Sequence, residues 1–161
     1  VDLMAGRSRS AARLVLVLNL RSACRCRSVN WNWAILSSRL KIIVVDDDVI
    51  VCEHTTELLR QIGIRSDWET CGQRAVQKVL AAHQAGEPYD AVILDCRMPD
   101  QDGVETAAII RRAISEPLPI ILISAYDSAD VETKARHAGV NGFMTKPVLC
   151  RLCVGRYRDM F

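Results

Sequence analysis

LKIIVVDDD, residues 40–48, is the stretch that decides the fold class of this chain. Its first six residues are almost wholly apolar and rich in β-branched side chains, which is typical of a short strand buried on both faces. Three aspartates follow, and apolar residues then recur at helical spacing from Val51 to Ile62, with Asp48 placed to cap the helix and Gly63 to end it. The stretch therefore predicts a strand that leads directly into a helix.

The same alternation of strand-like and helix-like patterns continues to the end of the chain. Further strands are expected at Ile64–Trp68, Ala91–Leu94, Pro119–Ile123 and Val140–Thr145, and further helices near Ala75–Leu80, Val104–Ile114, Val131–Ala138 and Leu149–Asp159. Short β/α units of this kind require right-handed crossovers between parallel strands. We therefore expect an α/β fold: a doubly wound, five-stranded parallel sheet in the flavodoxin-like order 2-1-3-4-5, with helices on both faces.

The first 39 residues differ in composition from the rest of the chain. Residues 1–40 hold seven arginines and one aspartate, a charge of +6, so the remaining residues carry −4 of the overall +2. The segment shows no clear helical or strand period, and its apolar run Leu14–Leu18 is far shorter than the roughly 20 residues of a membrane helix. We predict a linker, a disordered arm or a non-native segment at 1–39, one folded domain at 40–161, and no membrane segment.

Cysteines and arginines suggest other sites, but only weakly. The seven cysteines are an odd number and several stand in apolar stretches, which favours small buried thiols and a reducing, cytoplasmic compartment. Cys150 and Cys153 have metal-ligand spacing, yet no second Cys or His pair accompanies them, so incidental thiols are favoured over a zinc site. The early arginines, with Trp31 and Trp33, belong to no recognisable nucleic-acid-binding domain, which favours a solvated arm.

Polar side chains stand at the carboxyl ends of four of the expected strands. The first strand ends in Asp46 and Asp47, the third in Asp95 and the fourth in Ser124, while the fifth leads into Lys146. In doubly wound sheets the ligand site lies beyond the carboxyl ends of the strands, where the strand order reverses. These five side chains are therefore expected to converge on one edge of the sheet.

The three aspartates at this edge carry a charge of −3 and repel one another, so the site needs a cation. With Lys146 and a bound Mg²⁺ the charges sum to zero, and Mg²⁺ is commonly held by one or two carboxylates together with waters and phosphate oxygens. A carboxylate can itself attack phosphorus and form an acyl phosphate when a metal and a lysine neutralise the transferred group. Asp95, which is central among these groups, is the candidate nucleophile.

Four segments look like the bacterial response-regulator receiver domain, the phosphoacceptor domain of two-component signalling: VVDDD (44–48), VILDCRMPDQDG (92–103), ILISA (121–125) and GFMTKP (142–147). The resemblance covers essentially residues 40–160. It implies a phosphoprotein whose Asp95 takes a phosphoryl group from a histidine kinase or a histidine phosphotransfer domain. Such a receiver either stands alone or belongs to a hybrid sensor histidine kinase.

The resemblance also implies a metal shell around the phosphoacceptor. Asp47 would bind Mg²⁺ directly and Asp46 would help through water, while Asp95 and the backbone carbonyl of Arg97 would complete the shell. No other cofactor is implied.

A second group of residues would act once the phosphoryl group is in place. The resemblance implies that Ser124 hydrogen-bonds the phosphoryl group, that Lys146 pairs with its oxygens, and that Phe143 is the aromatic switch residue. The output surface, and a face for homodimers, would then be formed by the fourth helix, the fifth strand and the fifth helix.

Other functions fit the residues less well. A haloacid-dehalogenase-type phosphatase has a second aspartate two residues after its nucleophile, where this chain has Arg97, and a nucleotide-binding sheet has a glycine-rich turn where this chain has three aspartates. The chain is not expected to be a conventional enzyme, beyond catalysing the phosphorylation and dephosphorylation of its own Asp95. The alternative that stays open is a receiver-like protein-interaction module that signals without phosphorylation.

Overall fold

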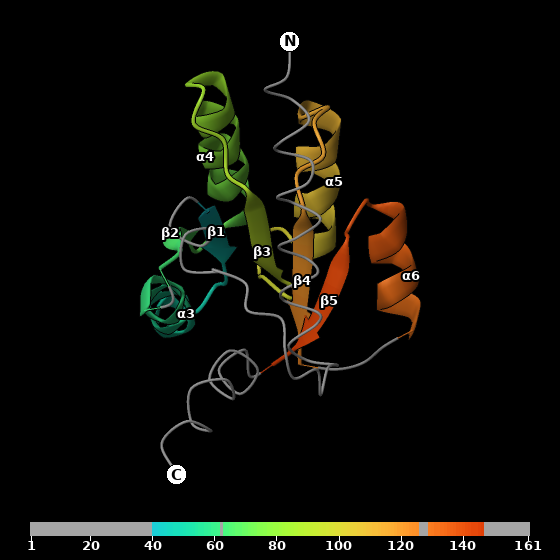
Figure 1. Ribbon diagram of the computed structural model, residues 1–161. Helices are drawn as coiled ribbons and strands as arrows, with labels where there is room; N and C mark the ends of the chain where they lie inside the picture. Colours follow the sequence, from blue (N-terminus) through green and yellow to red (C-terminus); the bar gives the residue numbers. More distant parts are fainter. Residues whose placement is uncertain (1–39, 62, 126–128, 147–161) are drawn as a thin grey trace, which may run out of the picture.

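The computed structural model describes residues 40–61, 63–125 and 129–146, and in these ranges five strands alternate with four α-helices. All neighbouring strands are parallel, and the sheet has the order β2-β1-β3-β4-β5, which confirms the expected architecture. Figure 1 shows the elements in chain order: β1 (Lys41–Val45), α3 (Val49–Gln61), β2 (Arg65–Glu69), α4 (Gly72–Gln84), β3 (Ala91–Asp95), α5 (Gly103–Ala113), β4 (Ile120–Ser124), α6 (Ala129–His137) and β5 (Gly142–Thr145). The helix expected at Leu149–Asp159 and the segment 1–39 lie outside the described residues.

Two apolar clusters, one on each face of the sheet, form the core. Ile43 and Val45 of β1 belong to the cluster that contains the apolar faces of α4 and α5, whereas Ile42 and Val44 belong to the cluster that contains Leu59 of α3. Successive residues of β1 are thus buried on opposite faces, as expected for a strand that is apolar throughout. Figure 1 shows α4, α5 and α6 as one layer over the sheet, with α3 apart from them.

Local sequence signals mark the ends of α3 and the start of α5. Asp48 accepts a hydrogen bond from Ile50 N at 2.8 Å at the start of α3, and Gly63, with φ of 84°, lies just beyond its end, as predicted. Asp102 is the N-cap of α5, because its side chain accepts from Glu105 N at 2.7 Å. None of the described helices is long and apolar enough to cross a membrane.

The entry to β5 is fixed by a polar contact between α5 and the turn after α6. The Arg111 guanidinium donates to the carbonyl of Gly139 at 2.9 Å and to the side chain of Asn141. The same Asn141 side-chain oxygen accepts from Ile120 N, the first residue of β4, at 2.9 Å. This contact sets the start of the strand that leads into Lys146 at the other end.

Candidate functional site

The carboxyl ends of three strands bring two aspartates and a lysine into direct contact. Asp46 directly follows β1, Asp95 is the last residue of β3, and Lys146 directly follows β5. The ammonium of Lys146 lies 2.8 Å from Oδ2 of Asp46 and 2.9 Å from Oδ1 of Asp95. Residues 100 positions apart in the chain therefore form one ion-paired group at the edge of the sheet.

The second oxygen of each of these two carboxylates is held by the main chain. Oδ1 of Asp46 accepts a hydrogen bond from Asp48 N at 3.0 Å, and Oδ2 of Asp95 accepts one from Arg97 N at 3.1 Å. Both side chains are almost fully buried, with exposed fractions of 3% for Asp46 and 5% for Asp95. Their orientation is therefore fixed before any ligand arrives.

Asp47 completes the cluster and differs from its two neighbours. It is exposed, and among the described residues it has no hydrogen-bond or ion-pair partner for its carboxylate. One carboxylate oxygen from each of Asp46, Asp47 and Asp95 lies within 4.8 Å of the others. The three carboxylates and Lys146 leave a formal charge of −2, so a divalent cation with oxygen ligands fits both the donor set and the charge.

The electrostatics of the cluster show the cost of burying these charges together. Burial raises the pKa of the Asp95 carboxyl, the contact with Lys146 opposes this shift, and the charge of Asp46 adds to it. Burial alone would lower the pKa of Lys146, but its hydrogen bonds to Asp46 and Asp95 and their charges raise it overall. Lys146 therefore stays protonated, and further positive charge near Asp95 would stabilise its ionised form.

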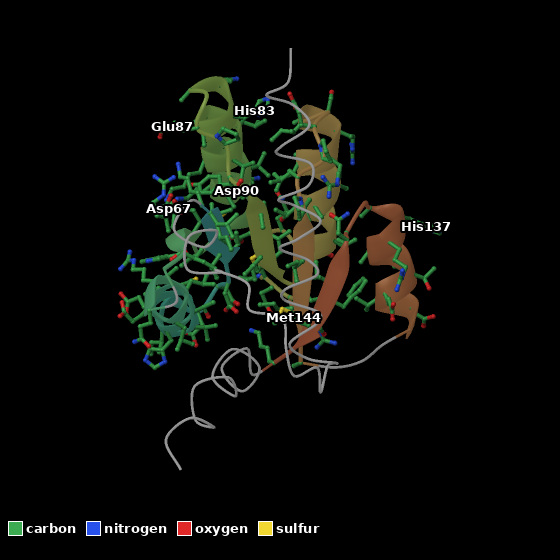
Figure 2. The ribbon with its side chains drawn as sticks, viewed as in Figure 1. Asp67, His83, Glu87, Asp90, His137 and Met144 are labelled. Atoms are coloured by element: carbon green, nitrogen blue, oxygen red, sulfur yellow. The ribbon has the colours of Figure 1, made fainter. Side chains whose placement is uncertain are left out.

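Other acidic residues of the sheet have structural partners away from this cluster. Asp67 accepts a hydrogen bond from the Tyr89 hydroxyl at 2.7 Å, and Asp90 accepts one from Lys41 N at 2.8 Å. Figure 2 shows Asp90 toward the upper, amino ends of the strands, whereas Met144 lies toward their lower, carboxyl ends. Asp90 therefore lies at the opposite end of the sheet and Asp67 in the middle of β2, and neither is a candidate for the site.

The remaining predicted site residues lie around the cluster at different depths. Ser124 is the last residue of β4, half-buried, and its carbonyl accepts from Lys146 N at 2.9 Å. Arg97 is exposed and touches Asp95 through its main-chain N–H. Phe143 lies back along β5, opposite Leu122, with the Arg136 guanidinium 5.8 Å from its ring centre, so it does not reach the cluster.

Two residues that support the site were not singled out from the sequence. A Cβ atom on Gly103 would lie 2.2 Å from the carbonyl oxygen of Asp95, so α5 starts directly against the backbone of the candidate nucleophile. The sequence signal that could have pointed to Gly103 is its place between a turn and a helical pattern. Cys52 of α3 donates through its thiol to the Asp46 carbonyl at 3.2 Å, and burial raises its pKa to about 11, so it stays a protonated structural thiol.

Comparison with known proteins assigns the family. The model of the response regulator receiver domain matches residues 42–153. The chain belongs to this family. The match includes the strands, the aspartates and the lysine that form the cluster, and it confirms the resemblance drawn from the sequence.

The relatives of this receiver domain include kinases as well as regulators. It is 32% identical over 110 residues to the osmosensing histidine protein kinase SLN1 of Saccharomyces cerevisiae, and 32% identical over 110 residues to the transcriptional regulatory protein ZraR of Klebsiella oxytoca. Each match covers 68% of this chain, but only 9% of the yeast kinase and 24% of the bacterial regulator. The similarity is therefore confined to the receiver part of longer proteins, and it is not restricted to bacteria.

Solved structures of other receiver domains share the fold. The receiver domain of the histidine kinase CKI1 from Arabidopsis thaliana, complexed with Mg²⁺, superposes with a TM-score of 0.65 at 26% identity, over 78% of this chain and 96% of that one. Chemotaxis protein CheY4 of Vibrio cholerae matches with a TM-score of 0.63 at 21% identity, over 76% of this chain and 98% of that one. The sheet and helices described here are thus those of a receiver domain of two-component systems.

Proposed function

We propose that Asp95 is the phosphoacceptor of this receiver domain and that its donor is a phosphohistidine on a histidine kinase or a histidine phosphotransfer domain. The observation that carries the proposal is the position of Lys146, whose ammonium bridges Asp46 and Asp95 at 2.8 and 2.9 Å. A cation held against a buried carboxylate can neutralise a phosphoryl group that arrives at the same carboxylate.

The proposed step is a transfer between two nucleophiles. A carboxylate oxygen of Asp95 forms a bond to phosphorus while the phosphorus–nitrogen bond of the phosphohistidine breaks, and the bonding electron pair returns to the imidazole. The hydrogen bond from Arg97 N to Oδ2 of Asp95 holds the carboxylate in a fixed orientation, which favours in-line attack. The ammonium of Lys146 can then pair with the oxygens of the transferred phosphoryl group.

Mg²⁺ is the proposed cofactor, because the donor set fits it. Asp47 offers an exposed carboxylate without a partner in the described part of the chain, and Asp46 and Asp95 each lie within 4.8 Å of it through one oxygen. The backbone carbonyl of Arg97 is proposed as a further ligand. When bound, the ion would offset the charge of −2 and neutralise the oxygens of the transferred group.

Residues next to the cluster would transmit the effect of phosphorylation to the output surface. We propose that Ser124, at the end of β4, bonds the phosphoryl group, and that Phe143, on the strand that leads to Lys146, changes position in response. The output surface, or a homodimer face, would then include α6 and β5. The expected last helix lies outside the described residues, and the division at residue 39 and the cytoplasmic location stay predictions.

Phosphorylation with a small phosphodonor in the presence of Mg²⁺ tests the proposal directly. We expect the chain to gain the mass of one phosphoryl group, in an acid-labile linkage of the acyl phosphate type, and we expect Asp95→Asn to show no gain. Asp90→Asn is the matched control, because Asp90 is a partly buried aspartate at the opposite ends of the strands. Uptake by Asp95→Asn at the wild-type rate would refute Asp95 as the phosphoacceptor, and no uptake by the wild-type chain would favour the interaction module.

A further inference from the structure

The loop that follows Asp95 is attached to the body of the domain at few points. Residues 96–102 connect β3 to α5; Cys96, at the start, is buried, and beyond it only two side chains are buried, Met98 and Gln101, each with an exposed fraction of 7%. Met98 belongs to an apolar core cluster, and an apolar side chain there needs no specific polar partner. Gln101 is a polar side chain in the interior, and its position needs a specific partner.

Thr106 supplies that partner. Nε2 of Gln101 lies 2.9 Å from Oγ1 of Thr106, which is itself fully buried and donates to the Asp102 carbonyl at 2.8 Å. Asp102 in turn caps α5 through its bond from Glu105 N. The side chain of Gln101 therefore ties the middle of the loop to the first turn of α5.

Helix α4 closes the other side of Gln101. A Cβ atom on Gly72, the first residue of α4, would lie 2.4 Å from Oγ1 of Thr106 and 3.2 Å from Nε2 of Gln101. The missing side chain at Gly72 is what lets the amide and the hydroxyl fit beneath α4. Gln101 is thus enclosed between two helices, and its place does not depend on the solvent.

The same loop carries the groups that touch the phosphoacceptor. Its ends are closed by a hydrogen bond from Gly103 N to the Cys96 carbonyl at 3.2 Å, and Arg97 N bonds the Asp95 carboxylate inside this closed turn. With both ends fixed, the two buried side chains set the path of the main chain between them. The Arg97 peptide lies in that path, between Asp95 and the Gln101 anchor.

We propose that Gln101 is a positioning residue for the cation site: held by Thr106 beneath α4, it fixes the loop that presents the Arg97 main chain to Asp95. Gln101 touches neither the phosphoryl group nor the ion. The inference rests on the proposed function, because it concerns the same cation site. It adds that α4, through Gly72, shares in setting the affinity of that site.

Mg²⁺ affinity of the unphosphorylated chain, measured by calorimetric titration, is the readout. We expect Gln101→Ala to raise the Kd for Mg²⁺ about tenfold, which is the effect typical of losing a residue that orients a metal ligand. Gln101→Met keeps most of the volume but loses the amide, so a smaller increase is expected. Gln73→Ala and Gln73→Met, at an exposed position of α4, should leave the Kd unchanged.

Thr106→Val tests whether the hydrogen bond is the cause. This variant keeps the shape of Thr106 and removes the oxygen that accepts from Gln101, and it also removes the bond from Thr106 to the Asp102 carbonyl, so its Kd should rise at least as much as in Gln101→Met. Because both changes remove the bond between Gln101 and Thr106, the double variant Gln101→Met/Thr106→Val should show no further increase over Thr106→Val alone. Additive increases would contradict a shared role.

A purely structural role makes a different prediction. If Gln101 only stabilises the fold, Gln101→Ala lowers the free energy of unfolding measured in EDTA but leaves the Kd for Mg²⁺ unchanged, and the proposal is then wrong. A positioning role also predicts that the phosphorylation rate with a small donor recovers at saturating Mg²⁺. A wild-type chain that binds no Mg²⁺ would instead refute the proposed function and, with it, this inference.

Discussion

Gly103 illustrates how a single residue without a side chain supports the site. Its Cβ position overlaps the Asp95 carbonyl oxygen at 2.2 Å, and a backbone atom of a central strand cannot move away cheaply. We expect Gly103→Ala to lower the free energy of unfolding by about 1–3 kcal/mol, the usual cost of overpacking. Urea denaturation followed by circular dichroism measures this. Gly142→Ala is the control, because its Cβ would meet Ile121 at an ordinary 3.9 Å.

Asp95 should make the stability of the metal-free chain depend on pH. Burial raises its pKa in the folded state, so the folded chain binds this proton more tightly than the unfolded chain does. Stability then falls as the pH rises from the ordinary carboxyl value of about 3.9 through the raised pKa. In EDTA, Asp95→Asn should therefore be more stable than wild type at neutral pH, and the gap should narrow toward pH 4.

Chemical denaturation of both proteins between pH 4 and pH 7 measures this difference. Asp90→Asn is the control, since the Asp90 carboxylate accepts from Lys41 N and lies outside the cluster. A gap between Asp95→Asn and wild type that is constant over this range would show that the proton on Asp95 is not the cause.

At the scale of single residues, the sequence predicts the charged groups of the site but not the residues that hold them in place. Asp46, Asp95 and Lys146 could be predicted to converge, because each stands at a strand end and parallel strands end at one edge. The place of Gln101 depends on how α4 packs on α5, and no local pattern specifies that packing. A buried glutamine in an otherwise polar loop gives no signal until the helices are in place.

The first turn of α3 presents apolar side chains beside the acidic cluster. Val49 and Ile50 are 44% and 65% exposed, and they are the large apolar residues that the described part of the chain leaves most open to solvent. They directly follow Asp46, Asp47 and Asp48. An apolar contact next to the phosphoacceptor is well placed to hold a protein donor.

We expect Ile50→Ser to slow phosphoryl transfer from a phosphohistidine protein about tenfold, which corresponds to the loss of about 1.4 kcal/mol of contact. Transfer from a small phosphodonor should be unchanged, because that donor needs no docking surface. Radiolabel transfer measured side by side with the two donors separates the effects. Gln84→Ser, at the end of α4, is the control, and an equal loss with both donors would contradict a docking role.

Strands were easier to place from the sequence than helices were. The apolar runs mark β1 and β3 within a residue of their bounds, because strands buried on both faces have few polar positions. For α4 the pattern indicates only Ala75–Leu80, the buried face, whereas the helix spans Gly72–Gln84. Gln73, Arg74 and Gln84 near its ends are polar and exposed, and their helical state follows from hydrogen bonds that continue the helix and not from a periodic pattern.

Cation binding should stabilise the whole domain. An ion that binds only the folded chain adds about 2.7 kcal/mol to the free energy of unfolding at a concentration 100 times its Kd. We expect Mg²⁺ to produce such an increase in urea denaturation, and Asp47→Asn to reduce it strongly, because Asp47 is the exposed carboxylate of the cluster. Glu53→Gln removes a charge on α3 outside the cluster and serves as the control. Equal stabilisation of wild type and Asp47→Asn would place the ion elsewhere.

The topology of the whole molecule followed from the alternation of patterns. Each strand-like run is separated from the next by a helix-like one, and right-handed crossovers with short connections leave few arrangements. The order β2-β1-β3-β4-β5 was therefore predictable, although the contact that joins Arg111 to Gly139 and Asn141 was not. That contact joins residues about 30 positions apart on elements whose relative position only the folded sheet determines.

The ion pair between Lys146 and Asp46 spans 100 positions, and this distance has a consequence for synthesis on the ribosome. At about 5–20 residues per second, the lysine is added roughly 5–20 s after the first aspartate of the pair. During that interval a nascent chain already carries Asp46, Asp47 and later Asp95 without the ammonium that will join them. Strand β5 thus delivers the internal counter-ion, and the acidic edge can settle without help from metal in the cell only after residue 146 has been added.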